Sequence, residues 1–265
     1  MEQAFAAVAG TDFTGGLSPV AFGLAVAVTL FAGFVKGAIG FAMPLIMISA
    51  FAAFMPPALA LAALILPVVV TNSQQAFRQG PRAAWDTTVK YRRMIAMIVL
   101  FIVVSAQFVL VIPGWLMLGL LGVPVTAFAL VQLLGVDLRL QLKHRKGAEY
   151  GLGVMGGLYG GISGVWGPPV IVYLVSVGAE KYERVRVQGV IFLIGGIVLL
   201  SAHLQTGVLN ALTLPLSLAL VVPAALGMWL GFKLQDRLDP LRFRRWTLIL
   251  LAITGLNLVR EAVMG

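Results

Sequence analysis

The chain has 265 residues, of which 60% are hydrophobic and 11% are charged, and it contains no cysteine. That balance, with a mean hydropathy of +0.99, is typical of an integral membrane protein and excludes an ordinary soluble domain. The absence of cysteine excludes disulfides, thiolate catalysis and cysteine-ligated zinc. Residues 1–17 carry no Lys or Arg, so they lack the basic region of a signal peptide.

The formal net charge of +9 comes from basic residues that are concentrated in four short segments. Seventeen of the nineteen Lys and Arg residues fall in the ranges 78–93, 139–146, 181–186 and 233–245. These segments do not form a basic face interleaved with aromatic residues, which argues against nucleic-acid binding. They follow the positive-inside pattern, which places all four on the cytoplasmic side of a membrane.

Eight apolar runs follow one another along the chain. Most of them have about the 20 residues that a membrane-spanning helix needs, whereas the first is much longer. The runs lie at 19–54, 57–77, 94–112, 115–134, 151–177, 189–205, 212–232 and 246–263.

The first run contains a glycine-rich motif that returns once in the second half. Gly33 to Pro44 reads GFVKGAIGFAMP, and Gly157 to Pro168, 124 residues later, reads GLYGGISGVWGP. Three glycines at positions i, i+4 and i+7 followed by proline interrupt a helix, and proline is favoured in the first turn of a new one. We therefore interpret the chain as a duplication with a broken helix in each copy. Packing faces of small residues are the alternative interpretation of the same spacing.

The charge pattern predicts how the two broken runs sit in the membrane. If the run at 151–177 crossed once, the basic segments before and after it would lie on opposite sides, so we predict a hairpin that enters and leaves on one side. The same reasoning makes 19–54 a hairpin on the outer side. Each half is then a broken hairpin plus three crossings, and an odd number of crossings inverts the second half. The predicted fold is an all-α polytopic membrane protein with two inverted repeats, 1–135 and 136–265, in one membrane domain.

Lys36 is a full charge inside a long apolar run, where a cation is costly and by default marks a functional path or a partnered charge. No carboxylate occurs at comparable depth in any apolar run, which favours a bound anion as its partner. Snorkelling to water or pairing with backbone carbonyls is the alternative. The helix starts at Pro44 and Pro168 would direct backbone N–H groups and positive dipole ends to the same place.

Polar residues elsewhere complete the candidate site. The second motif adds hydrogen-bonding and aromatic groups, and the cluster Thr71 to Gln75 ends the second run, where Thr71 and Gln75 share a helix face. That pair fits a vestibule lining and helix–helix hydrogen bonding equally well. A lone His203 is more typical of a structural hydrogen bond than of a proton carrier. The candidate substrate-binding residues are Lys36, Gly37, Gly40, Gln75, Tyr159, Gly161, Ser163, Gly164 and Trp166.

The sequence does not indicate an enzyme. It contains no HExxH, GxSxG or P-loop motif and no pair of carboxylates in a usable context, so we predict no catalytic residue, no metal site and no cofactor.

The repeated GxxxGxxG motif with its following proline, the eight apolar runs and the chain length resemble the sulfite exporter TauE/SafE family, also called the toluene-sulfonate uptake permease family. The resemblance covers nearly the whole chain. It implies a carrier of sulfite, sulfonates or related organosulfur anions in the bacterial inner membrane, built from two inverted repeats. The family's motif residues fall on Gly33, Gly37, Gly40, Gly157, Gly161 and Gly164, with Pro44 and Pro168 following. Phe41, Ala42 and Met43 stand where many members have further glycines.

We therefore predict a secondary transporter that moves a small sulfur-containing anion by alternating access, with export as the expected direction. An anion channel and a membrane scaffold protein that does not transport are the alternatives. The expected partners are the anion and the lipid bilayer, not nucleic acid, and homodimer formation is left open. The identity of the anion, the direction and the coupling ion do not follow from the sequence.

Overall fold

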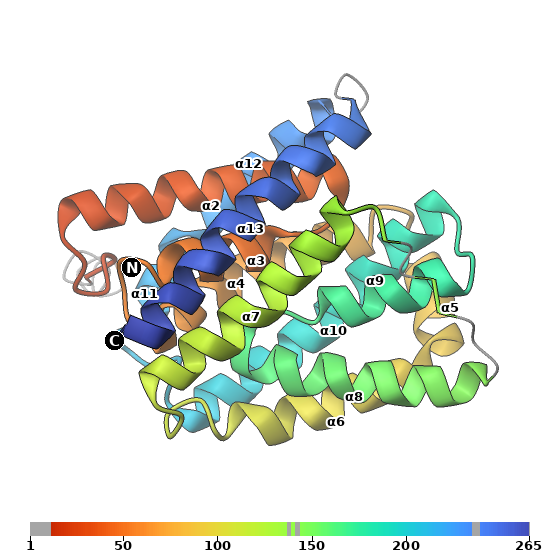
Figure 1. Ribbon diagram of the computed structural model, residues 1–265, viewed down its shortest axis with the longest axis horizontal. Helices are drawn as coiled ribbons and strands as arrows, with labels where there is room; N and C mark the ends of the chain where they lie inside the picture. The colour runs from red at the N-terminus through yellow and green to blue at the C-terminus, as the bar shows by residue number, and fades with distance from the viewer. Residues whose placement is uncertain (1–11, 137–138, 141–143, 235–238, 265) are drawn as a thin grey trace, which may run out of the picture.

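The computed structural model describes residues 12–136, 139–140, 144–234 and 239–264 (Figure 1). Within these ranges the regular structure is helical throughout and contains no strand, which confirms the predicted all-α class. Lys143 and Arg237, which belong to two of the basic segments, lie outside the described residues. Among the described residues, six helical stretches are long and apolar enough to cross a membrane: Pro19–Ile39, Pro57–Ala76, Gly114–Leu133, Glu183–Thr206, Leu214–Leu234 and Arg242–Met264.

The described residues of the first half form six helices. They are α2 (Pro19–Ile39), α3 (Met43–Phe51), α4 (Pro57–Ala76), α5 (Pro81–Lys90), α6 (Arg92–Ala106) and α7 (Gly114–Leu133). The second half forms α8 (Arg145–Ser163), α9 (Gly167–Ser176), α10 (Lys181–Thr206), α11 (Leu214–Ala219), α12 (Val221–Leu234) and α13 (Pro240–Met264).

Both glycine-rich motifs break a helix at the same point. α2 ends at Gly40 with φ 87°, and α8 ends at Gly164 with φ 70°, both in the left-handed region that favours glycine. α3 and α9 then begin 124 residues apart, each with a proline in its first turn, so the predicted helix starts at Pro44 and Pro168 are confirmed. Each broken helix is thus a hairpin with a long arm, α2 or α8, and a short arm, α3 or α9. The two arms of each hairpin pack against each other.

The broken runs and their neighbours differ from the predicted bounds. The second hairpin begins at Arg145 instead of residue 151, and α10 begins at Lys181 instead of residue 189, because the basic segments continue the helices into polar surroundings. The segment 78–93, expected as a loop, contains α5, which starts at Pro81 and carries Lys90 in its last turn. α6 has 15 residues and is shorter than the predicted run, because the chain leaves the helix after Ala106.

The helices pair across the two halves. α2 packs on α12 and α8 packs on α6, while α4 packs on α10 and α7 packs on α13. In Figure 1, α2 starts at the left end of the molecule and α8 starts at the right end, so the two long arms run in opposite directions. α5 also lies at the right end, whereas α13 ends at the left.

Glycines allow α2 to approach α12 closely, and α8 to approach α6. A Cβ on Gly37 of α2 would lie 2.3 Å from the carbonyl oxygen of Met228, and one on Gly231 of α12 would lie 2.2 Å from that of Phe34. A Cβ on Gly157 of α8 would lie 2.7 Å from the carbonyl oxygen of Ile98 in α6. The backbones themselves are in contact, as in other small-residue interfaces between membrane helices.

Candidate anion-binding site

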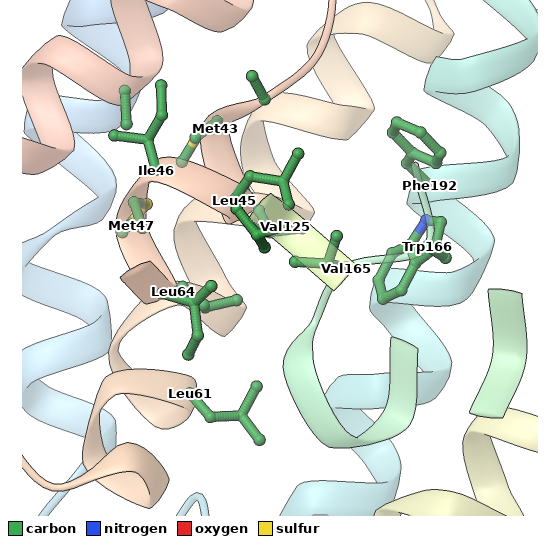
Figure 2. Close-up of a cluster of buried hydrophobic side chains, with 14 of the residues drawn as sticks. Met43, Leu45, Ile46, Met47, Leu61, Leu64, Val125, Val165, Trp166 and Phe192 are labelled. Atoms are coloured by element: carbon green, nitrogen blue, oxygen red, sulfur yellow. The ribbon is translucent and has the colours of Figure 1, made fainter. Parts of the chain in front are cut away.

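A small cavity lies where the two helix breaks meet. Its lining comes from both breaks and from α4 and α10: Phe41, Ala42, Pro44, Leu45, Asn72, Gly164, Val165, Trp166, Gly167 and Phe192. The volume is about 20 Å³, room for roughly one water molecule. Figure 2 shows Leu45 of α3 and Val165 of the second break in one apolar cluster, with Trp166 beside Phe192. The two motifs, far apart in sequence, therefore share one site.

The starts of α3 and α9 are part of this lining. Pro44 and Leu45 belong to the first turn of α3, and Gly167 belongs to that of α9. The first turns of helices carry unpaired backbone N–H groups and the positive end of the helix dipole. Both helix starts therefore bring the positive end of a helix dipole to the cavity, although Pro44, Pro168 and Pro169 have no N–H to donate there.

Lys36 is fully buried one turn before the first break, with 1% of its surface exposed. Its Nζ donates to Thr71 Oγ1 at 2.9 Å and also to Asn72 Oδ1. Both acceptors are neutral, and no ion pair joins Lys36 to an acidic side chain within the described ranges. The negative end of the α2 dipole lies in the same turn and favours the cation. The lysine does not snorkel to the surface.

Two side-chain hydrogen bonds satisfy backbone carbonyls of α4 near Pro67 and the acceptors of Lys36. Pro67 lacks an N–H, so the carbonyl of Ala63 has no helical partner, and Ser217 Oγ from α11 donates to it at 3.3 Å. Thr71 Oγ1 donates to the Pro67 carbonyl at 2.7 Å and so presents its lone pair to Lys36. The polar end of α4 is thereby fixed against the end of α2.

Asn72 connects Lys36 to the cavity and to the second half of the chain. Its Oδ1 accepts from Lys36, its Nδ2 donates to the carbonyl of Phe192 in α10 at 2.9 Å, and its side chain lines the cavity, whereas Lys36 does not. Sequence reasoning included Asn72 in the polar cluster but singled out only Thr71 and Gln75. Helix periodicity contains no signal for Asn72 or Phe192, because their importance comes from the contact between α4 and α10.

Gln75 closes the first break from the same helix. It is 1% exposed, and its Nε2 donates to the carbonyls of Gly40 at 3.0 Å and Val185 at 2.9 Å. Its Oε1 is buried and has no hydrogen-bond partner in the part of the chain that the structure describes. Gln75 therefore bridges the first break and the start of α10.

The other predicted site residues lie around the second break or in helix interfaces. Gly164 and Trp166 line the cavity. Ser163 Oγ accepts from the N–H of Val165 at 3.1 Å and holds the break locally, and Tyr159 donates to the carbonyl of Leu121 in α7 at 3.2 Å. Gly37 faces α12, and Gly161 faces α6, where its Cβ would lie 2.1 Å from Ser105 Oγ. Of the nine predicted residues, only Gly164 and Trp166 line the cavity. The other seven, Lys36, Gly37, Gly40, Gln75, Tyr159, Gly161 and Ser163, lie outside its lining.

His203 makes structural hydrogen bonds. It is buried, with Nε2 at 3.0 Å from the carbonyl of Gly161 and Nδ1 at 3.3 Å from Thr206 Oγ1. Ser201 and Gln205, which lie one turn apart on the same helix, are both exposed.

A polar cluster anchors the second hairpin at the end of the molecule that carries α5. Glu149 of α8 is 5% exposed and accepts from Tyr173 of α9 at 2.7 Å. Arg93 and Arg145 lie at 3.5 and 3.8 Å from the same carboxylate. Glu149 therefore joins the two arms of this hairpin.

The buried Lys36, the two helix starts and the small cavity lie inside a bundle of helices long and apolar enough to cross a membrane, which is the architecture of a multi-pass membrane protein. The model of the sulfite exporter TauE/SafE family matches residues 25–258, nearly the whole chain, and the chain belongs to that family. Its members are membrane transporters of sulfur anions such as sulfite. The comparisons found no matching curated protein and no matching solved structure.

Proposed function

We propose that the chain is a secondary carrier that moves a small sulfur oxyanion across the bacterial inner membrane by alternating access. One observation carries the proposal: Lys36 is a buried cation held by neutral acceptors, next to a cavity formed by both helix breaks. A buried charge without a permanent counter-ion is costly, and a bound anion relieves that cost.

The arrangement of the helices supports two inverted repeats, residues 1–135 and 136–265. In such a repeat α2 corresponds to α8, and α6 corresponds to α12. The contact between α2 and α12 then has its counterpart in the contact between α8 and α6, and both contacts are present. The opposite directions of α2 and α8 fit the same symmetry (Figure 1). With the basic segments in the cytoplasm, rocking of one half against the other would open the central cavity to either side.

Export follows from the charge of the substrate. No paired carboxylates that would bind a coupling cation were predicted in the apolar runs, so the membrane potential is the simplest driving force. It contributes about 2.3 kcal/mol per charge per 100 mV and drives an anion out of a cell whose interior is negative.

The Lys36→Gln variant tests the proposed function. Saturable uptake of sulfite or isethionate into proteoliposomes should disappear, because the neutral amide no longer attracts the anion, while the purified protein remains folded in detergent. Arg260→Gln is the matched control, since it removes the same charge from an exposed position on α13 and should transport normally. Unchanged uptake by Lys36→Gln would refute the site.

The same vesicles separate a carrier from a channel. In vesicles preloaded with unlabelled anion, a carrier accelerates the entry of labelled anion. A channel instead gives a current that does not saturate. Counterflow is the expected result, and currents of that kind would support the channel instead.

A further inference from the structure

The residues that fill the space beside the helix break differ between the two halves of the chain. The positions 124 residues after Lys36, Thr71 and Asn72 are all glycine: Gly160, Gly195 and Gly196. The indole of Trp166 fills the space, because a Cβ on Gly160 would lie 2.6 Å from it and one on Gly195 would lie 3.1 Å from it. The second break forms without a cation or its acceptors, so the fold of the break does not require the polar group of the first half.

Asn72 is the member of that polar group that meets the cavity. Thr71 Oγ1 is also tied to the Pro67 carbonyl of its own helix, and Thr71 does not line the cavity. Asn72 is the one carboxamide in the cavity lining, and its oxygen accepts a hydrogen bond from Lys36, so this residue contacts both the lysine and the cavity. An ammonium group favours an anionic oxygen over a neutral amide oxygen, because charge-assisted hydrogen bonds are roughly twice as strong as neutral ones.

We propose that Asn72 Oδ1 occupies the place of a substrate oxygen on Lys36 and is displaced when the anion binds. The inference rests on the proposed transport function and names the residue that controls access to its cation. The side chain of Asn72 turns away from Lys36, and an oxygen of the anion takes over the hydrogen bond from Nζ.

Displacement of Asn72 also explains two other properties of the site. A cavity of about 20 Å³ holds roughly one water molecule, so a sulfur oxyanion needs additional space, and movement of the amide provides it. The same movement breaks the hydrogen bond from Nδ2 to Phe192, which links α4 to α10. Binding of the anion thereby loosens a contact between the two halves, which is the contact that rocking must change.

Two substitutions of Asn72 test the proposal by changing anion binding in opposite directions. Asn72→Asp places a permanent carboxylate on Lys36, so the Kd for sulfite should rise by roughly 10- to 100-fold, the range that a charge-assisted hydrogen bond covers. The melting temperature of Asn72→Asp without sulfite should be equal to or above that of the wild type. Asn72→Ala removes the competing oxygen, so its melting temperature without sulfite should fall, while the increase caused by sulfite should exceed that of the wild type.

Purified full-length protein in detergent is melted with sodium sulfite and, separately, with sodium chloride at equal ionic strength. Thr71→Val is the control, because Thr71 contacts Lys36 without blocking the cavity, and it should lower stability without enlarging the sulfite effect. Should Asn72→Ala fail to fold, Asn72→Ser has the same expectation. Equal sulfite effects in the wild type, Asn72→Asp and Asn72→Ala would overturn the displacement, as would weaker sulfite binding by Asn72→Ala.

The wild type separates failure of this inference from failure of the function. If wild-type protein is not stabilised by sulfite or isethionate and does not transport them, the proposed function fails and the displacement fails with it. If the wild type binds and transports them while the Asn72 variants behave alike, only the displacement of Asn72 is refuted.

Discussion

Gln75 shows how much a single buried amide contributes at the first break. It donates to the carbonyls of Gly40 and Val185, and Gly40 occupies the left-handed turn between α2 and α3. The amide is the donor found for the Gly40 carbonyl, so its removal leaves a buried acceptor at the point where the chain reverses.

We predict that Gln75→Met lowers the free energy of unfolding by about 1–3 kcal/mol, the cost of leaving a buried acceptor without a donor. Thermal unfolding in detergent measures the change. Gln74→Met is the matched control on the same helix, because Gln74 is exposed and its loss should leave the melting temperature nearly unchanged. Equal melting temperatures for the two variants would show that the Gly40 contact does not stabilise the break.

For single residues, the sequence identifies an unusual buried charge more readily than it identifies which side chains contact one another. Lys36 stands out because a cation in an apolar run is rare, and the structure buries it, but its side-chain acceptors Thr71 and Asn72 were not predicted as its partners. Asn72 could not be distinguished from other amides at helix ends, since its role depends on α10, which lies 120 residues away in sequence. Gly37 and Gly161 were assigned to the substrate site by spacing alone, and their immediate neighbours are helix backbones and side chains.

At the scale of elements, the glycines of α2 and α12 form one interface from both sides. Gly33 and Gly37 meet the carbonyls of Ala224 and Met228, and Gly227 meets that of Leu30. The sequence indicated both this packing and a break from the same motif, and the structure contains both: Gly33 and Gly37 pack, whereas Gly40 turns.

We predict that Gly37→Ala destabilises the protein by about 1–3 kcal/mol, because a methyl group forced into a packed interface displaces backbone. Its Cβ would lie 2.3 Å from the Met228 oxygen and 2.9 Å from Gly231 Cα. Gly23→Ala on the same helix has no atom within 4 Å of its Cβ and should be neutral or gain about 0.5–1 kcal/mol from helix propensity. Melting both variants in detergent compares them directly, and a stable Gly37→Ala would contradict the close approach of α2 and α12.

α5 is the element that the sequence analysis missed. Its ten residues, PRAAWDTTVK, were interpreted as a loop because they are too short and too polar to span a membrane. Pro81 starts the helix, and Arg186 of α10 fixes it by donating to Thr87 and Gln79. The buried positions of α5, Ala84 and Thr87, are three residues apart, so the helix is amphipathic, and a search for long apolar runs passes over a helix of this kind. The positions of the apolar runs were predictable for the opposite reason, since membrane thickness dictates their length.

At the scale of the whole molecule, the topology rests on which helix ends share a side of the membrane. The hairpin arms start at opposite ends of the bundle, and α5 lies at the end where α8 starts (Figure 1). The charge rule then assigns α5 and the start of α8 to the cytoplasm, and the connections 107–113 and 207–213 to the outside.

The absence of cysteine makes this assignment directly testable. We predict that single cysteines at Val111 and Leu212, which are 71% and 80% exposed, react in intact spheroplasts with a maleimide that cannot cross the membrane. Cysteines at the exposed positions Arg82 and Trp85 should react only after the membrane is permeabilised. Each variant should first be shown to transport sulfite, so that labelling reports on active protein. Labelling of Arg82→Cys from outside together with Leu212→Cys would place basic and uncharged connections on one side. The two hairpins could then not enter from opposite faces, and alternating access through their shared cavity would lose its structural basis.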